Sequence, residues 1–349
     1  MKFRNRKKWL IIAQYCLGWT LAFVFLTVVR GVGTTEMGSV QFEIESSLLF
    51  SLIMGPLFGS ISGYAQIVTE ERVYGRVPIQ RLLIFRLVFA ILFLFLLILF
   101  GYFFVINFFN VQVDFATFVV EPGSFAIYFY ILFVDFVLSI VRQVNLMLGG
   151  RNLIRLIGGK FYDPHEEDRI FMFLDLQSST QLAEKLGHAK YSRFIQDCFN
   201  DLGAVVENEA EIYQYVGDEV VLTWMLKDGL RNQNCLNAFY NFKSQLVGKS
   251  AYYDQKYGSQ PYFKAGMNSG TVMVAEVGKY KKDIAYHGDT LNTAARIQGK
   301  CNEFGEELLI SSELKQQLGD SNFTFRTMGS IPLRGKESGV EIFAVAKEK

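Results

Sequence analysis

Four long apolar runs fill the first part of the chain and predict helices that cross a membrane. They cover residues 10–29, about 46–68, about 87–106 and about 124–141, and each is close to the ~20 residues that span a bilayer. The first run could instead be a secretory signal peptide, but its apolar core is long and no small-residue cleavage site follows it. We therefore expect a four-helix transmembrane domain over residues 1–142, in the cell (inner) membrane.

The basic residues near these runs predict their orientation. Five Lys and Arg precede the first run, whereas the loops at 31–45 and 111–122 contain none. Four arginines mark the connection between the second and third runs: Arg72, Arg76, Arg81 and Arg86. Because Lys and Arg near helix ends resist translocation, both termini are predicted to be cytoplasmic.

Two features inside the runs predict helix contacts. Gly55, Gly59 and Gly63 recur every four residues, which places small residues on one helix face where two backbones can approach closely. This face could pack within one subunit or between subunits. Asp135 lies midway along the fourth run, where an ionised carboxylate is costly, so it is either a sensor or a packing residue.

Residues 143–165 are predicted to form a jointed, helical linker to the second half of the chain. Gly149-Gly150 and Gly158-Gly159 interrupt a helical apolar spacing, and Pro164 ends it. This linker is the covalent route by which events in the membrane would reach residues 166–349.

The second half alternates between strand and helix patterns. Residues 170–174 form a continuous apolar run that is typical of a buried strand, and a helical stripe extends from Tyr191 to Val205. Two strand-like runs joined by Gly217-Asp218 then predict a hairpin. A helical stretch ends near residue 256, and three separate strand-like runs follow it at residues 263–270, 271–278 and 281–288. Another helix begins near Asp289. This order predicts an α/β domain with one sheet and helices on one face.

Composition and charge exclude several classes of protein. Of the 349 residues, 50% are hydrophobic, and 21 of the 33 Phe precede residue 137, which excludes disorder and places the apolar excess in the membrane half. The net charge of +1 gives no field that would attract a nucleic acid. The four Cys form no CxxC pair, which excludes a disulfide scaffold or a zinc site.

Two aspartates are predicted to meet at one edge of the sheet. Asp175 follows the first strand and Asp218 lies in the hairpin turn, so pairing of these strands would bring both carboxylates together. Two divalent cations held by such oxygens can serve a phosphoryl transfer. Each residue also has an ordinary alternative, Asp175 as an acid at a helix N-terminus and Asp218 as a turn residue.

Three motifs favour the interpretation of Asp175 and Asp218 as a metal site. FMFLDLQSST, YQYVGDEVVLTW and HGDTLNTAARI stand in the order typical of class III nucleotidyl cyclases, and the resemblance covers residues 166–345. It implies a ferredoxin-like palm that works as a head-to-tail homodimer. It also implies that the domain makes cyclic AMP or cyclic GMP from ATP or GTP and releases pyrophosphate, with two Mg²⁺ or Mn²⁺ ions per site.

The resemblance assigns roles to individual residues. Asp175 and Asp218 match the metal aspartates, with the backbone carbonyl of Leu176 as a further ligand. Asn292 and Arg296 match the residues that stabilise the transition state, where a guanidinium fork suits the charge on the α-phosphate. One of two basic residues resembles the ligand of the terminal phosphates, Arg334 or Lys336.

The positions that select the base depart from the family pattern. Gln214 and Ala285 stand where adenylate cyclases usually have Lys and Asp or Thr, and where guanylate cyclases have Glu and Cys. An amide both donates and accepts hydrogen bonds, so Gln214 permits either purine. We predict a membrane-bound adenylate cyclase, with a guanylate cyclase as the alternative.

Other functions compete with this prediction. VGDEV resembles the GGDEF hairpin of diguanylate cyclases, but GDTLNTAAR is foreign to that family. A degenerate cyclase domain that only dimerises or receives a signal would have lost an Asp or the Arg, and none is lost here. A transporter with a regulatory tail is disfavoured by only four spans and one buried acid.

Overall fold

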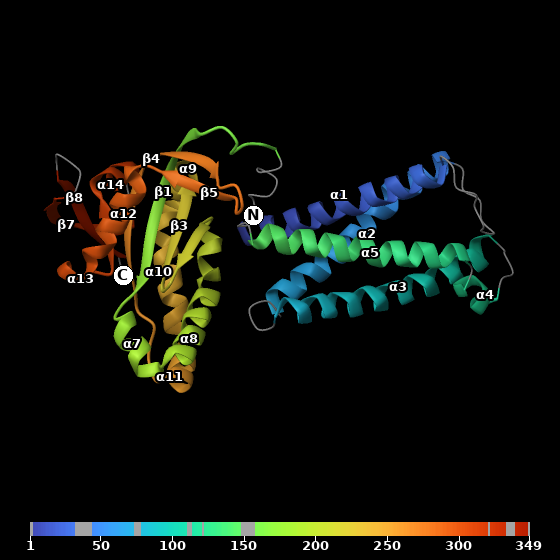
Figure 1. Cartoon of the computed structure of the whole chain (residues 1–349), viewed down its shortest axis with the longest axis horizontal. Helices are drawn as coiled ribbons and strands as arrows, with labels where there is room; N and C mark the ends of the chain where they lie inside the picture. The colour runs from blue at the N-terminus through green and yellow to red at the C-terminus, as the bar shows by residue number, and fades with distance from the viewer. Residues whose placement is uncertain are drawn as a thin grey trace. The chain divides into compact units, whose positions relative to one another are not determined.

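The computed structural model of the protein describes residues 3–31, 44–72, 78–109, 114–120, 122–147, 158–319, 322–332 and 339–347. The chain divides into two compact units, one of residues 3–147 and one that begins at Leu148 (Figure 1). Residues 148–157, in the middle of the predicted linker, lie outside the described residues, as do Arg334 and Lys336.

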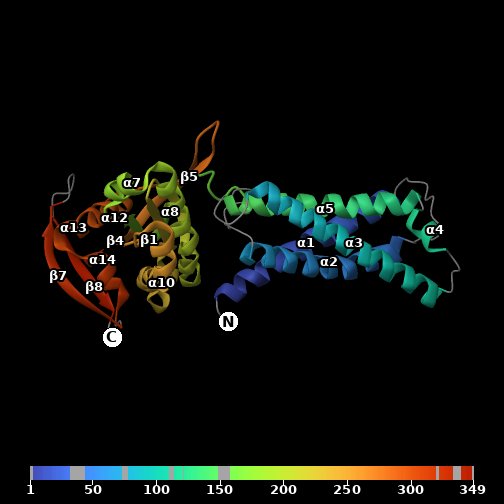
Figure 2. The same ribbon diagram turned by 90° about the horizontal axis from the view of Figure 1, so that it is seen from below.

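The first unit is a bundle of long helices, which lie side by side in Figure 2. Its helices are α1 (Phe3–Gly31), α2 (Ile44–Arg72), α3 (Ile79–Phe109), the short α4 (Phe115–Val120) and α5 (Pro122–Met147). Four of them are long and apolar enough to cross a membrane: α1, α2, α3 and α5. Large apolar side chains such as Leu21, Phe25 and Phe129 are exposed on the bundle, as expected where lipid is the solvent. The four predicted runs are confirmed as helices long and apolar enough to cross a membrane, and their orientation stays a prediction.

The glycine face of α2 packs within the chain, against α1. A Cβ added at Gly59 would lie 2.3 Å from Cys16 Cα, and one at Gly55 would lie 2.4 Å from Thr20 Oγ1. Gly63 approaches Ile12 Cα in the same way. Because glycine has no side chain, the backbones of α1 and α2 can approach closely at these positions. The glycine face therefore packs within one subunit and not between subunits.

Arg81 and Arg86 lie inside α3 and not in a connection, so the prediction is wrong for these two residues, and Arg76 lies outside the described residues. Arg86 is buried, with its Nη2 2.8 Å from Asp135 Oδ1 on α5. The guanidinium also donates to the Ser62 carbonyl oxygen on α2 at 3.0 Å and to Ser139 Oγ on α5 at 3.2 Å. Because each of these groups would be costly to bury alone, Asp135 serves a buried ion pair that ties three helices together.

The second unit is built on one mixed, eight-stranded sheet. The strands are β1 (His165–Leu176), β2 (Glu211–Val216), β3 (Glu219–Met225), β4 (Phe263–Val277), β5 (Asp283–His287), β6 (Leu308–Ser311), β7 (Phe323–Ile331) and β8 (Val340–Lys347). Their order is β2-β3-β1-β4-β6-β8-β7, with β5 paired to β4. Thus β1 is central and antiparallel to both β3 and β4. The predicted α/β fold is confirmed, although residues 263–277 form a single strand where the sequence pattern indicates two.

Helices cover both faces of this sheet. The helical segments are α7 (Ser179–Leu186), α8 (His188–Asp201), η1 (Leu202–Asn208), α9 (Leu226–Leu230), η2 (Arg231–Gln233), α10 (Asn234–Gly248), α11 (Ser250–Tyr257), α12 (Asp289–Gly299), α13 (Cys301–Phe304) and α14 (Ser312–Leu318). Met172 of β1 shares a core with Phe194 of α8 and Phe239 of α10, whereas Phe171 shares another with Ala294 of α12. Because neighbouring residues of a strand face opposite sides, α12 lies on the other face from α8 and α10, and the predicted one-sided arrangement is wrong.

Two glycines of β4 let α12 lie directly on the sheet. A Cβ at Gly266 would come within 2.1 Å of the Gln298 backbone nitrogen, and one at Gly270 would lie 2.7 Å from Thr290 Oγ1. The close approach fixes the helix that carries Asn292 and Arg296 relative to β1 and β4.

Candidate active site

The end of β1 brings acidic residues together at one edge of the sheet. Asp175 lies opposite Glu219 of β3, and Gly217, with a φ of +63°, makes the tight turn that precedes Asp218. Burial and the nearby Asp218 charge raise the pKa of Asp175. Burial, Asp175 and Asp218 likewise raise the pKa of Glu219 to about 6. The structure therefore places the Asp175 and Asp218 charges close together, as the hairpin pattern predicts.

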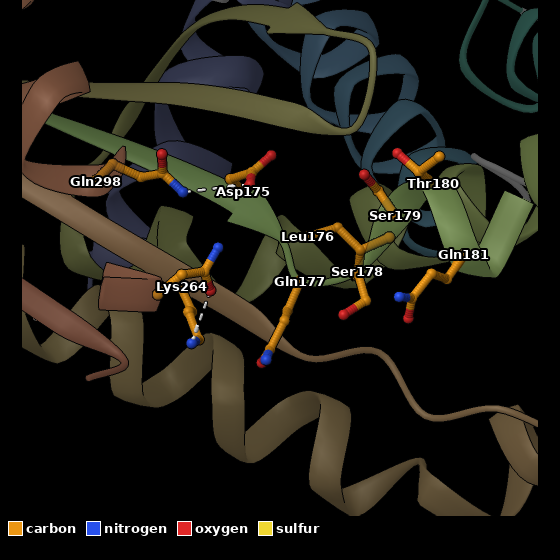
Figure 3. A pocket seen from close by; sticks show the side chains of 10 residues that line it. Asp175, Leu176, Gln177, Ser178, Ser179, Thr180, Gln181, Lys264 and Gln298 are labelled. Atoms are coloured by element: carbon orange, nitrogen blue, oxygen red, sulfur yellow. Dashed lines mark hydrogen bonds between the residues drawn. The ribbon is translucent and has the colours of Figure 1, made fainter. Parts of the chain in front are cut away.

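A polar pocket of about 330 Å³ opens beside Asp175 (Figure 3). It is lined by ten residues: Asp175, Leu176, Gln177, Ser178, Ser179, Thr180, Gln181, Lys264, Gln298 and Asn302. Leu176 is thus one of the residues that line the pocket, and its role as a backbone ligand stays a prediction. Ser178 has a φ of +57°, so the chain turns sharply there and leads into α7. The pocket joins a carboxylate, an ammonium and the N-terminal turn of a helix, whose backbone N–H groups favour anions.

Three residues that reach this pocket from β4, α12 and α13 were not singled out from the sequence. Gln298 Nε2 of α12 donates to Asp175 Oδ2 at 3.3 Å, and Lys264 Nζ of β4 donates to Asn302 Oδ1 at 3.0 Å (Figure 3). Lys264 is only 8% exposed although it carries a charge. The sequence could have indicated Lys264, because it is a lysine at the start of an otherwise apolar strand. Gln298 and Asn302 have no distinguishing pattern in the sequence.

Asn292 and Arg296 lie on α12, outside the lining of this pocket. Asn292 is exposed, and Arg296 is half-buried with a buried Nη1 that has no hydrogen-bond partner within the described residues. An unpaired guanidinium nitrogen is costly to bury, which is typical of a group that awaits an anionic partner. Within one chain, Asn292 and Arg296 are therefore not among the residues that line the pocket beside Asp175.

The two predicted base-selecting residues lie on different strands. Gln214 is exposed on β2, and Ala285 is half-buried on β5, opposite Ala275 of β4. Their neighbours Tyr213 and Tyr286 meet edge to face, with ring centroids 4.9 Å apart. The two tyrosine side chains therefore bridge β2 and β5, which are not neighbours in the sheet.

The described residues contain no group of three or more His, Cys, Asp or Glu side chains placed to hold a metal ion. The predicted set is smaller, since it consists of two aspartates and a backbone carbonyl. Two like charges whose proximity raises the pKa of Asp175 are chemically suited to a hard cation.

Comparison with known proteins identifies the second unit. Residues 162–347 match the family described as "Adenylate and Guanylate cyclase catalytic domain". The chain is 29% identical to Adenylate cyclase 2 of Rhizobium meliloti over 207 residues, which cover 59% of this chain and 57% of that protein. It is 25% identical to an adenylate cyclase of Anabaena cylindrica, over 50% of this chain and 36% of that one. The chain thus spans about half or less of the length of these relatives.

A solved structure supports the fold. A bacterial light-regulated adenylyl cyclase aligns with a TM-score of 0.54 and 16% identity, over 65% of this chain and 67% of that chain. The resemblance on which the sequence analysis relied is confirmed, and so is the cyclase-type α/β domain behind four candidate membrane helices.

Proposed function

The chain belongs to the adenylate and guanylate cyclase family, and we propose that it converts ATP to 3′,5′-cyclic AMP and pyrophosphate at a site shared by two copies. The observation that carries this proposal is the pocket at the end of β1. Asp175 lines this pocket together with Lys264, and the Asp218 charge lies close enough to raise the pKa of Asp175. Carboxylates that bind cations and an ammonium that binds phosphate are the two groups that a nucleoside triphosphate requires.

Asp175, Asp218 and the carbonyl of Leu176 would hold two Mg²⁺ or Mn²⁺ ions. When bound, such ions neutralise the triphosphate and stabilise the charge that develops as the 3′-oxygen attacks the α-phosphate. Gln298 donates to Asp175 and so fixes the orientation of that carboxylate. Since Gln298 is neutral, it does so without competing for the cation.

The chain's cations have separate tasks in this proposal. Lys264 binds the phosphates from the side of the pocket, with its ammonium held by Asn302. Arg296, whose Nη1 has no partner within the described residues, turns toward the α-phosphate bound by a second copy, with Asn292 beside it. Arg334 or Lys336 binds the terminal phosphates.

ATP is the proposed substrate, and GTP is the alternative that the experiment must decide. Curated adenylate cyclases among the relatives support ATP. Gln214 is exposed and can pair with either purine, and Ala285 offers no polar group. We also propose that both termini face the cytoplasm, where nucleoside triphosphates are made available to the second unit.

The test is product identification with the full-length protein in detergent. The purified chain is incubated with each of four nucleoside triphosphates and Mg²⁺ or Mn²⁺, and the cyclic product is identified by mass spectrometry. Asp175→Asn and Asp218→Asn should each lower the rate by at least ~10²-fold, because each removes a charge that holds a cation. If no triphosphate is cyclised, or if both variants keep full activity, the proposal fails.

Complementation tests the shared site. A mixture of Asp175→Ala and Arg296→Ala chains should recover activity, since one of the two sites in each mixed dimer has all its residues. The matched control mixes Asp175→Ala with Asp218→Ala, which damage the same side and should give no recovery. Equal recovery in both mixtures, or in neither, contradicts a site built from two chains.

A further inference from the structure

A buried arginine lies on the same face of β1 as Asp175, but in the first half of the strand. Arg169 is 0% exposed. Its Nε donates to Glu167 Oε2 at 2.8 Å, and its Nη1 donates to Glu211 Oε2, at the start of β2, at 3.1 Å. Six residues of strand separate it from Asp175, about 20 Å, so it cannot touch the reacting atoms.

The Arg169 guanidinium also lies over one of the two tyrosines that neighbour the predicted base-selecting residues. The Arg169 Cζ lies 4.7 Å from the centroid of the Tyr286 ring, which in turn meets Tyr213 edge to face. Tyr286 is the neighbour of Ala285 on β5, and Tyr213 is the neighbour of Gln214 on β2. A cation beneath an aromatic ring is a favourable and directional contact, especially where water is excluded.

From this arrangement we propose that Arg169 is a positioning residue for base selection. Through the contact of Tyr286 with Tyr213 it links β5 to β2 across the face of the sheet, and so sets the spacing between Ala285 and Gln214. The inference rests on the proposed cyclase function and adds a residue remote from the catalytic groups. Lysine could not replace it, because only a planar guanidinium can bind Glu167 and Glu211 together while it stacks on a ring.

The segment that precedes β1 joins the same cluster. Lys160 Nζ donates to Glu167 Oε1 at 2.7 Å, and the Phe161 carbonyl oxygen accepts from the Glu276 backbone nitrogen of β4 at 2.8 Å. Burial alone would raise the pKa of Glu167, but hydrogen bonds from Lys160 and Arg169 outweigh it and lower the pKa to about 2. Glu276 is paired with Ile284 of β5. Residues 160–161, which follow the predicted linker's glycines, are therefore attached to the cluster that positions β5.

The experiment measures nucleotide selectivity in the full-length protein. The variants are Arg169→Met, Arg169→Lys and Tyr286→Leu, and the readouts are kcat and KM for ATP and for GTP together with the melting temperature. Arg169→Met and Tyr286→Leu should each change the ATP-to-GTP ratio of kcat/KM by about fivefold or more, mainly through KM. Arg169→Lys keeps the charge but not the fork, and should fall between Arg169→Met and the unmodified chain.

The control is Asp201→Asn, which damages a buried ionic contact on the opposite face of the sheet. Asp201 accepts from Tyr253 Oη at 2.8 Å and pairs with Lys249, and neither partner belongs to the cluster around Arg169. This variant should lower the melting temperature and leave the selectivity ratio unchanged.

The outcomes separate this inference from the proposed function. A purely structural role for Arg169 predicts that Arg169→Met and Tyr286→Leu behave like Asp201→Asn, and that result overturns the inference while the cyclase activity stands. If Arg169→Met does not fold, Tyr286→Leu decides, because it removes the supported ring without stranding a charge. If the unmodified chain cyclises neither ATP nor GTP, the proposed function fails, and the inference fails with it.

Discussion

Replacement of Gly266 by alanine is expected to damage activity more than stability, because it displaces the helix that carries Asn292 and Arg296. The new Cβ would stand 2.1 Å from the Gln298 backbone nitrogen and 2.7 Å from the Ala294 carbonyl oxygen. Both are backbone atoms, which cannot rotate out of the way as a side chain can. To restore an ordinary contact, α12 must retreat from β4 by about 1 Å.

The consequences of this displacement can be put in numbers. Overpacking of this kind costs about 1–3 kcal/mol, which a folded domain often survives. A misplacement of ~1 Å can cost about 10²-fold in rate where catalysis depends on alignment. Gly266→Ala should therefore remain folded with a lowered melting temperature, and its kcat should fall by one to two orders of magnitude, or roughly 10- to 100-fold.

The matched control uses the same substitution in the displaced helix itself. Gly299, the last residue of α12, has no atom within 4 Å of an added Cβ, so Gly299→Ala should leave kcat and melting temperature near those of the unmodified chain. Thermal unfolding and steady-state kinetics on the three proteins are sufficient. If Gly266→Ala loses stability but keeps its kcat, close packing of α12 on β4 does not position the catalytic residues, and the reasoning is refuted.

Two further predictions concern buried charges. Asp135→Ala should destabilise the membrane bundle by about 3–5 kcal/mol, because it leaves the Arg86 guanidinium unpaired. Arg86→Met combined with Asp135→Leu should recover most of that loss in a thermal unfolding assay in detergent. A double variant that is no more stable than the single one would contradict this prediction. The pKa of Glu167 is lowered from 4.5 to about 2, so its contribution, at most about 3 kcal/mol, is complete above pH ~4.5 and disappears as the pH falls toward 2. Glu167→Gln should flatten this part of the stability–pH curve, and an unchanged curve would show that the carboxylate is not held in this way.

The features that the sequence predicts are those encoded locally. An apolar run of about 20 residues needs no partner to indicate a membrane span. Asp175 follows an apolar strand and Asp218 follows a turn glycine, so their convergence requires only that neighbouring strands pair. Local patterns therefore suffice for the membrane bundle, the order of the first four elements of the second unit and the acidic edge.

The features that the sequence does not predict depend on contacts between distant residues. Arg86 borders an apolar run and resembles a flanking charge until Asp135, 49 residues later, is placed beside it. Gln298 lies 123 residues from Asp175, the carboxylate it contacts. The amphipathic pattern of α12 shows that one side is buried, but not which face of the sheet buries it. The sequence did contain one indication of the face that α12 covers. Gly266 and Gly270 lie in a strand, where glycine is unusual, and they mark the place where the helix approaches β4.

The distribution of charges over the second unit explains why one chain is an incomplete enzyme in this proposal. Asp175 and Lys264 line one pocket and the Asp218 charge lies close to Asp175, while Arg296 on α12 keeps a buried Nη1 without a partner in the described part of the chain. A guanidinium acts on a transition state only when it touches the charge that develops, so a chain that binds the triphosphate beside Asp175 needs an Arg296 supplied from elsewhere. In this proposal the four spans hold two copies in one membrane and so raise their effective concentration. Formation of the site between the two copies then depends more on how the copies are aligned than on how often they meet. Small changes in the path of residues 158–167 would then alter activity through the position of the second unit, and through the cluster of Glu167 and Arg169 that the same segment touches.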